Sequence, residues 1–333
     1  MEFNDRKKEI GAAVRKFRKE KGLSQKQLIY ARGEKYPVLS ENALIAIEKG
    51  KTLPKQETLD IVLSILDKTM SDLLEEIDRE AKVSFNNAIE NISLLVSNHK
   101  YSEANILLMS LKEDEIVYNK VDPANRQIVG FYEGVFAYKL HKDPTQALKI
   151  LKEELAIRRP AVFSKKKKEL DIDRIDNDKL AKESLSFIDY RMLSSISNIK
   201  FDIGLYDESV EILYSVIKSL NTKLVAKSVK DNMLNMIYFN LSNNLKKLKR
   251  YSEALEVCDL GIVLCKVIKT TKTLGELYSN KGEIYGYLKD IEKAHHFYKL
   301  SCDQFIRDDE PEKLEITRNG ALEVHGISVD ISS

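Results

Sequence analysis

The sequence contains little of what strands, tight turns and covalent cross-links require. Among its 333 residues are 13 glycines, 6 prolines, 3 cysteines and no tryptophan. Because tight turns between strands depend on glycine and proline, these low counts favour long helices with few breaks. The cysteines are odd in number, lack a paired spacing and have no histidines nearby in a ligand pattern. They argue against a disulfide framework and a zinc site, and we expect small core residues in a reducing compartment.

Long hydrophobic runs are absent as well. The first ten residues, "MEFNDRKKEI", contain no apolar signal segment, and no run approaches the roughly 18 apolar residues of a membrane span. We therefore expect a cytoplasmic protein without a membrane partner. Apolar residues make up 43% of the chain, which is enough for a large core, and the length predicts two or more domains.

Catalytic motifs are also missing. The five histidines form no HExxH motif, and the chain has no phosphate-cradling GxxxxGK[ST] loop. We expect no enzymatic activity, no metal ion and no cofactor.

Charge is unevenly distributed along the chain. Residues 1–55 hold 14 Lys and Arg against 7 Asp and Glu, a net charge of +7. The remaining residues hold 40 against 45, a net charge of −5. A basic head on a mildly acidic body indicates one module that binds a polyanion.

The first 75 residues show the signals of several short helices. Apolar residues at helical spacing predict a helix over 5–21, followed by a glycine that ends it. The N-caps that we expect are Ser24 for a second helix, Ser40 for a third and Ser71 for a short fifth turn, "SDLLEEI". Gly50 closes the third helix and Pro54 opens the fourth.

The sequence "KGLSQKQL…IEKGKTLPKQETLDIVLSILDKTMSDLL" resembles the phage-repressor-like helix-turn-helix family. The resemblance implies that Gln25 contacts the phosphate backbone and that residues 41–46 face the major groove. Two departures stand out. Ser24 and Ser40 are 16 residues apart, which indicates an insertion of roughly five residues within "RGEKYPVLS". The reading face also lacks the arginine that such helices often carry.

Base recognition would then rest on a few small side chains. Asn42 is the main candidate because its amide can pair with adenine, and Glu41 could accept from cytosine. Ala43 or Ile45 could contact thymine methyl groups. We expect phosphate contacts to supply most of the affinity. The candidates for these contacts are Arg15, Arg18, Lys26, Arg32, Lys35, Lys49 and Lys51. The alternative is a helix-turn-helix kept only for folding or dimerisation, which would leave the basic charge unexplained.

One phrase recurs in the rest of the chain. Its copies are "HKYSEANILLMSL" at 99–111, "KDPTQALKILKEEL" at 142–155, "GLYDESVEILYSVI" at 204–217, "KRYSEALEVCDLGI" at 249–262 and "KDIEKAHHFYKLSC" at 289–302. The small residues that align are Ala104, Ala147, Ser209, Ala254 and Ala294. An amphipathic helix precedes each copy, so this is the tetratricopeptide pattern.

In the widest gap between copies, the lysine-rich run at 164–179 predicts a solvated loop or helix face, with phosphate contact as the alternative.

The two patterns together predict an all-α protein. We expect a helix-turn-helix domain followed by a right-handed superhelix of about five degenerate repeats, with a concave wall. The boundaries that we expect are 1–75 for the DNA-binding domain, 76–98 for a connecting helix and the start of the first repeat, and 99–333 for the repeats, which would bind peptide and dimerise.

Asparagines recur at inward positions of the first helix in successive repeats. They are Asn198, Asn240 with Asn243, and Asn280 accompanied by Glu283. An asparagine amide can donate to and accept from a peptide bond simultaneously, so a row of them can hold an extended backbone. Arg191 could add charge beside such a ligand. The alternative is that these asparagines are solvent-exposed filler.

The combination is similar to the peptide-pheromone-sensing transcription regulators of Gram-positive bacteria, the Rap, Rgg, NprR, PrgX and PlcR group. In layout it is most similar to the PlcR branch, and the resemblance covers the whole chain. It implies a homodimeric quorum-sensing regulator that binds a two-fold symmetric operator on double-stranded DNA and a short signalling peptide.

The resemblance also implies roles for particular residues. It places Asn198, Asn240 and Asn280 at or near positions that hold the peptide backbone. It places His99 and Lys100 near a peptide carboxylate. The remaining alternative is an interaction regulator of the phage or mobile-element type, whose ligand is a partner protein.

Overall fold

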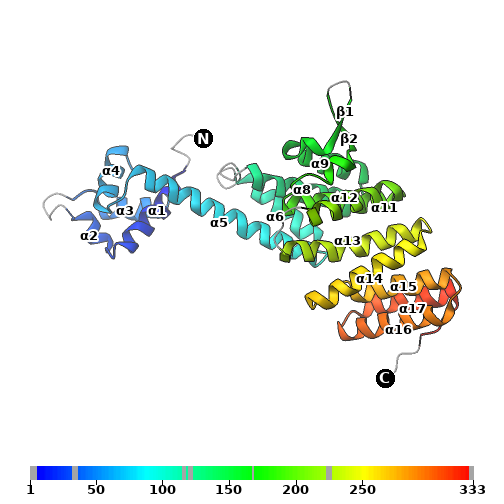
Figure 1. The fold of residues 1–333 in the computed structure, drawn as a ribbon. Coiled ribbons are helices and arrows are strands. Elements are labelled where there is room, and N and C mark those ends of the chain that lie inside the picture. The colour runs from blue at the N-terminus through cyan, green and yellow to red at the C-terminus, as the bar shows by residue number, and fades with distance from the viewer. Residues whose placement is uncertain are drawn as a thin grey trace. The chain divides into compact units, whose positions relative to one another are not determined.

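The computed structural model describes residues 6–31, 37–114, 118, 123–166, 169–222 and 227–329. The chain divides into two compact units, Met1–Arg126 and Gln127–Ser333. Within both units nearly all regular structure is helical, which confirms the predicted all-α class (Figure 1). No helix in the described part of the chain is long and apolar enough to cross a membrane.

Six described helices build the first unit. They are α1 (Lys7–Glu20), α2 (Gln25–Ile29), α3 (Glu41–Glu48), α4 (Gln56–Ile65), α5 (Met70–Ser97) and α6 (Tyr101–Glu113). The apolar stripe of α1 is buried against α3, α4 and the start of α5 in one core. Ser24 and Ser40 cap α2 and α3 as predicted, since their side chains accept hydrogen bonds from the backbone NH groups of Gln27 and Ala43. Gly22 ends α1 with a φ of +71°.

Two predicted boundaries in this unit were wrong. The fourth helix begins at Gln56, two residues after Pro54. The predicted short turn after Ser71 is instead the start of the 28-residue helix α5. Thr69 caps this helix, because its hydroxyl accepts from the NH of Asp72 while the Asp72 carboxylate accepts from the NH of Thr69. This reciprocal pair satisfies two NH groups that would otherwise lack partners, so the helix starts there.

The predicted insertion between the second and third helices falls largely on residues 32–36, which lie outside the described residues. Beyond them the chain returns to α2, where the NH of Val38 donates to the carbonyl of Ile29 at 3.0 Å.

The second unit contains the remaining helices, most of them in antiparallel pairs. Their bounds are α8 Pro123–Lys139, α9 Pro144–Arg158, α10 Asn177–Leu180, α11 Phe187–Asp202, α12 Tyr206–Thr222, α13 Lys227–Lys247, α14 Tyr251–Ile268, α15 Leu274–Tyr287, α16 Ile291–Arg307 and α17 Pro311–His325. Helices α13 to α17 lie side by side in chain order (Figure 1). This arrangement is a stack of helix pairs, as the repeats predict.

The lysine-rich run was predicted wrongly as a loop or helix face. It forms a β-hairpin of β1 (Phe163–Lys166) and β2 (Glu169–Ile175), which projects from the helices in Figure 1. A short 3₁₀ turn, η2 (Pro160–Val162), leads into it. Phe163 and Val162 are fully buried and anchor its base.

The small residue of each repeat phrase lies at a helix–helix contact. Ala104, Ala147, Ser209, Ala254 and Ala294 are all 0% exposed. Five residues before each of them the backbone has a positive φ. These residues are His99 (58°), Lys142 (57°), Gly204 (84°), Lys249 (60°) and Lys289 (64°). The same left-handed turn therefore joins the two helices of every repeat, although only one copy uses the glycine that this conformation favours.

Candidate functional site

The third helix of the first unit presents one free face. Glu41 and Asn42 are exposed, Ala43 and Ile45 are half-buried, and Leu44 points into the core. The same surface carries the exposed cations Lys49 and Lys51 just beyond the end of the helix. The side chains proposed for base contact are thus accessible on a short helix that is capped and packed from behind.

Four of the predicted phosphate contacts are exposed. These are Arg15, Lys26, Lys49 and Lys51. No carboxylate in the described residues forms an ion pair with any of them. They are therefore available to a polyanion. Two further candidates, Arg32 and Lys35, lie outside the described residues.

Arg18 is not available to DNA, which corrects its assignment. Its side chain is buried, and its Nη2 donates to Glu48 Oε2 at 2.9 Å while Nη1 donates to the Leu23 carbonyl at 2.8 Å. Gln25 is also engaged, since its Nε2 donates to the same Glu48 oxygen at 2.8 Å. Both side chains thus tie α1 and α2 to the end of α3, a positioning role that the sequence did not show.

The pKa of Glu48 reflects this network. Burial raises it, but the hydrogen bonds from Arg18 and Gln25 and the charges of Arg18 and Arg15 together hold the pKa below its usual range. Glu48 is therefore ionised at neutral pH, and it compensates the buried guanidinium.

The second unit contains a pocket of about 710 Å³ between α11, α13 and the loop before α15. It brings together three of the predicted ligand residues, Arg191 and Asn198 from α11 and Asn240 from α13. Its other lining residues are Phe187, Asn232, Met233, Asn235, Met236, Phe239, Thr270, Lys272 and Thr273. Most of them occupy one face of α13, where Asn232, Met236 and Phe239 recur at helical spacing.

Polar groups in this pocket differ in how far they are satisfied. The amide nitrogen of Asn240 is buried without a hydrogen-bond partner in the described part of the chain. Asn235 is fully engaged, because its Nδ2 lies 2.8 Å from Cys265 Sγ and its Oδ1 accepts from Thr273 Oγ1 at 2.7 Å. The Asn240 donor is thus left without a partner among the described residues, whereas Asn235 fixes the pocket wall. The sequence pattern missed Asn232 and Asn235, whose spacing to Asn240 along one helix face could have revealed them.

The third predicted asparagine has a different role. Asn280 is buried, its Oδ1 accepts from Lys246 Nζ at 2.9 Å, and its Nδ2 donates to Ser242 Oγ at 2.8 Å. Glu283 accepts from the same ammonium at 2.5 Å. This network joins α13 to α15 and does not line the pocket, so the buried Asn280 has a structural role, and the predicted peptide contact of Glu283 stays a prediction. Asn243 is half-buried and lies outside the pocket lining as well.

His99 and Lys100 belong to the first compact unit, and both are exposed. His99 occupies the left-handed turn between α5 and α6, and Lys100, the N-cap of α6, forms an ion pair with Glu103 at 3.5 Å. The equivalent turns at Lys142, Lys249 and Lys289 give His99 a conformational role. Its predicted contact with a peptide carboxylate stays a prediction.

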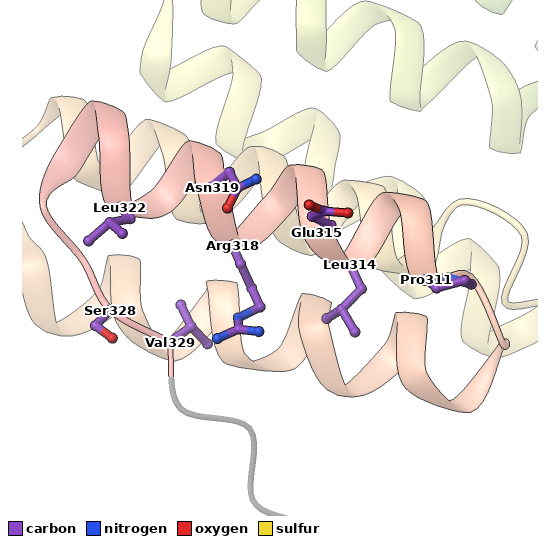
Figure 2. A pocket seen from close by; sticks show the side chains of 8 residues that line it. All are labelled: Pro311, Leu314, Glu315, Arg318, Asn319, Leu322, Ser328 and Val329. Atoms are coloured by element: carbon purple, nitrogen blue, oxygen red, sulfur yellow. The ribbon is translucent and has the colours of Figure 1, made fainter.

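A second, smaller pocket of about 390 Å³ lies beside the last helix. Figure 2 shows Arg318 pointing from α17 toward Val329, in the segment that follows the helix. The pocket is also lined by the exposed Asn319, and none of its lining residues belongs to the predicted asparagine series. It is therefore distinct from the pocket on α11 and α13.

A helix-turn-helix unit and stacked helix pairs define a recognisable class of fold. Neither a family model nor a curated protein matches the chain in sequence. Solved structures do match. The apo form of PlcR from Bacillus thuringiensis has a TM-score of 0.59 at 19% identity, over 94% of this chain and 98% of that chain. PlcR in complex with the peptide PapR7 and DNA has a TM-score of 0.54 at 20% identity, over 94% and 99%.

A streptococcal regulator has a similar fold. ComR from Streptococcus vestibularis, in complex with its signalling peptide XIP, has a TM-score of 0.53 at 15% identity, over 97% of this chain and 100% of that chain. The chain therefore has the fold of these regulators along nearly its whole length. At these identities the likeness establishes the fold alone.

Proposed function

We propose that this chain is a peptide-sensing transcription regulator of the cytoplasm. Residues 1–75 would bind promoter DNA, and 99–333 would bind a short signalling peptide and form the homodimer. Residues 76–98 would form the helix that connects these two parts and the start of the first repeat. The observation that carries the proposal is the pocket on α11 and α13, because it joins the unpaired amide donor of Asn240 to apolar walls in a chain that also has a basic helix-turn-helix. The solved complexes of PlcR and ComR with peptides support it.

The DNA contacts would be of two kinds, contacts with base edges and contacts with phosphates. Asn42 and Glu41 would meet base edges, and Arg15, Lys26, Lys49 and Lys51 would meet phosphates. Two heads of a homodimer would bind half-sites related by two-fold symmetry. The peptide would lie extended, with backbone groups bonded to Asn198 and Asn240.

The DNA part is tested by footprinting the full chain on fragments of its native genome. Affinity for a protected site should fall steeply with salt, with a slope of about −0.9 per phosphate contact. Replacing both Lys26 and Lys49 by Ala should reduce that slope by roughly 2. Exposed lysines of the second unit, Lys247 and Lys266, provide the charge-matched control and should leave the slope unchanged. Absence of any protected site, with or without peptide, would refute the proposal.

The peptide part is tested with a pooled library of synthetic heptapeptides captured by the full chain. Peptides retained by the wild type should be lost from an Asn240→Ala variant that folds normally. Retention that depends on neither the sequence of the peptide nor Asn240 would contradict peptide sensing at this pocket.

A further inference from the structure

Arg191 is an arginine without a carboxylate partner in the described residues, and it lines the ligand pocket. Its guanidinium carbon lies 4.4 Å from the ring centre of Phe131, 5.6 Å from that of Tyr132 and 5.9 Å from that of Phe187. Arg159 of the same unit behaves differently, since its Nε donates to the buried carboxylate of Asp189 at 2.8 Å. The protein thus pairs one arginine with an acid and holds the other by aromatic rings.

The rings determine what remains available on Arg191. An aromatic ring attracts a guanidinium through its face, and this contact leaves the N–H groups at the edge of the guanidinium unused. Phe131 and Tyr132 are buried, so two of the three rings are fixed in the core. The guanidinium is consequently held in position while its donors stay free, which suits a planar, bidentate acceptor.

The rest of the pocket strengthens the preference for an anion. Its only other charged lining residue in the described chain is the cation Lys272, and no Asp or Glu lines it. Met233, Met236 and Phe239 add apolar surface to the same lining. A carboxylate would therefore meet two positive charges, with room for an apolar side chain next to it.

We infer that the ligand of this pocket presents a carboxylate to Arg191, with an apolar side chain beside it and its backbone bonded to Asn198 and Asn240. The inference rests on the proposed peptide-binding function and specifies the chemistry of that peptide. Arg191 and Asn198 are seven residues apart on one helix, a rise of about 10 Å. An extended chain covers that distance in roughly three residues, so the carboxylate lies about three residues from the peptide group at Asn198.

The source of the carboxylate is either the C-terminus of the peptide or an Asp or Glu side chain. The heptapeptide library distinguishes them when it is made in two halves, one with free C-terminal acids and one with C-terminal amides. Enrichment confined to the acid half identifies the terminal carboxylate. Enrichment of Asp- or Glu-containing peptides within the amide half identifies a side chain. Either pattern supports the inference.

The decisive comparison uses the full chain with Arg191→Met, which keeps an unbranched side chain but removes the donors. Charge-assisted hydrogen bonds are strong enough that wild-type protein should prefer carboxylate-bearing peptides by roughly ten- to a hundredfold. Arg191→Met should lose this preference while it still captures peptides weakly through Asn198 and Asn240. Arg158→Met, at an exposed arginine outside the pocket, should behave as the wild type does. Thermal unfolding and DNA binding of each variant report whether it folds.

The outcomes separate this inference from the function on which it rests. If wild-type protein captures amidated peptides without Asp or Glu equally well, or if Arg191→Met keeps the preference, the carboxylate assignment is overturned while peptide sensing stands. If no heptapeptide is captured at all, both fall.

Discussion

Arg18 of α1 and Glu48 of α3 form a two-point ion pair inside the N-terminal unit, with Nε donating to Oε1 at 2.5 Å and Nη2 to Oε2 at 2.9 Å. Both side chains are less than 10% exposed. Removing one partner leaves a buried charge, and such losses cost about 3–5 kcal/mol. We expect Arg18→Met and Glu48→Gln each to destabilise the first unit by an amount near that range, measured by urea unfolding.

The double variant Arg18→Met/Glu48→Gln should be less destabilised than the sum of the single variants, because neither charge is then left alone. Arg15→Met is the control at an exposed position and should change stability by less than about 0.5 kcal/mol. Strict additivity of the two buried changes would show that the pair is not coupled.

The lowered pKa of Glu48 predicts how acid affects the first unit. A carboxyl whose folded pKa lies below its unfolded value of about 4.3 contributes stability that is fully present above that value. The contribution is lost as the pH falls through the folded pKa. We expect the free energy of unfolding to decline below about pH 5, and to decline less in Glu48→Gln.

Because hydrogen bonds with Thr69 also lower the pKa of Asp72, only the difference between the wild type and Glu48→Gln isolates Glu48. The measurement is urea unfolding between pH 7 and about pH 3. Parallel pH profiles for the two proteins would mean that Glu48 titrates normally.

The left-handed turns predict an unusual effect of glycine. Lys249 has a φ of +60°, which is costly for a side chain with a β-carbon, so Lys249→Gly should stabilise the second unit by about 0.5–1 kcal/mol. Gly204→Ala should destabilise it by about 1 kcal/mol, since φ there is +84°. Lys266→Gly, within α14, should cost about 1 kcal/mol and is the control. Thermal unfolding of the three variants decides the matter, and equal losses in Lys249→Gly and Lys266→Gly would contradict the account.

Two asparagines of the repeated series should differ in their effects. Asn240→Ala removes the unpaired donor of a pocket-lining residue, so peptide affinity should fall by about 1–3 kcal/mol, or roughly 5- to 150-fold. Asn280→Ala breaks the contacts with Lys246 and Ser242, so it should lower thermal stability and leave peptide affinity nearly unchanged. Calorimetry with a library-selected peptide measures the first effect.

The control for this pair is Asn87→Ala, at an exposed position on α5, which should affect neither property. Asn319 is unsuitable because it lines the pocket beside α17 (Figure 2). Wild-type peptide affinity in Asn240→Ala would remove Asn240 from the site.

The exposed face of α3 predicts weak reading of individual bases. It offers Asn42, Glu41 and small apolar side chains, so the sequence specificity for DNA should depend mainly on half-site spacing and DNA shape. Operators with altered spacers should lose more affinity than operators with single base changes under α3. If each single change costs the full ~1–3 kcal/mol of direct readout, this expectation is wrong.

Local signals in the sequence determined much of the architecture. The serine caps at Ser24 and Ser40, the apolar stripe of α1 and the aligned small residues of the repeats all lie where they were expected. Each of these features acts within a helix or at one helix–helix contact, and its physical requirement can therefore be read from spacing alone. The start of α5 was predicted wrongly because Thr69 and Ser71 can both cap a helix. Only the Asp72 carboxylate, which accepts from the NH of Thr69, selects between them.

Tertiary structure decided which polar side chains are free. The sequence by itself supplied a row of asparagines and a set of basic residues, but it could not assign partners to them. Arg18 meets Glu48 only because α1 packs against α3, and Asn280 meets Lys246 only because α13 packs against α15. Asn240 and Arg191 keep their donors because no carboxylate among the described residues approaches them. Pairing is a property of the faces that meet in space, and residue type and spacing along one helix do not specify those faces.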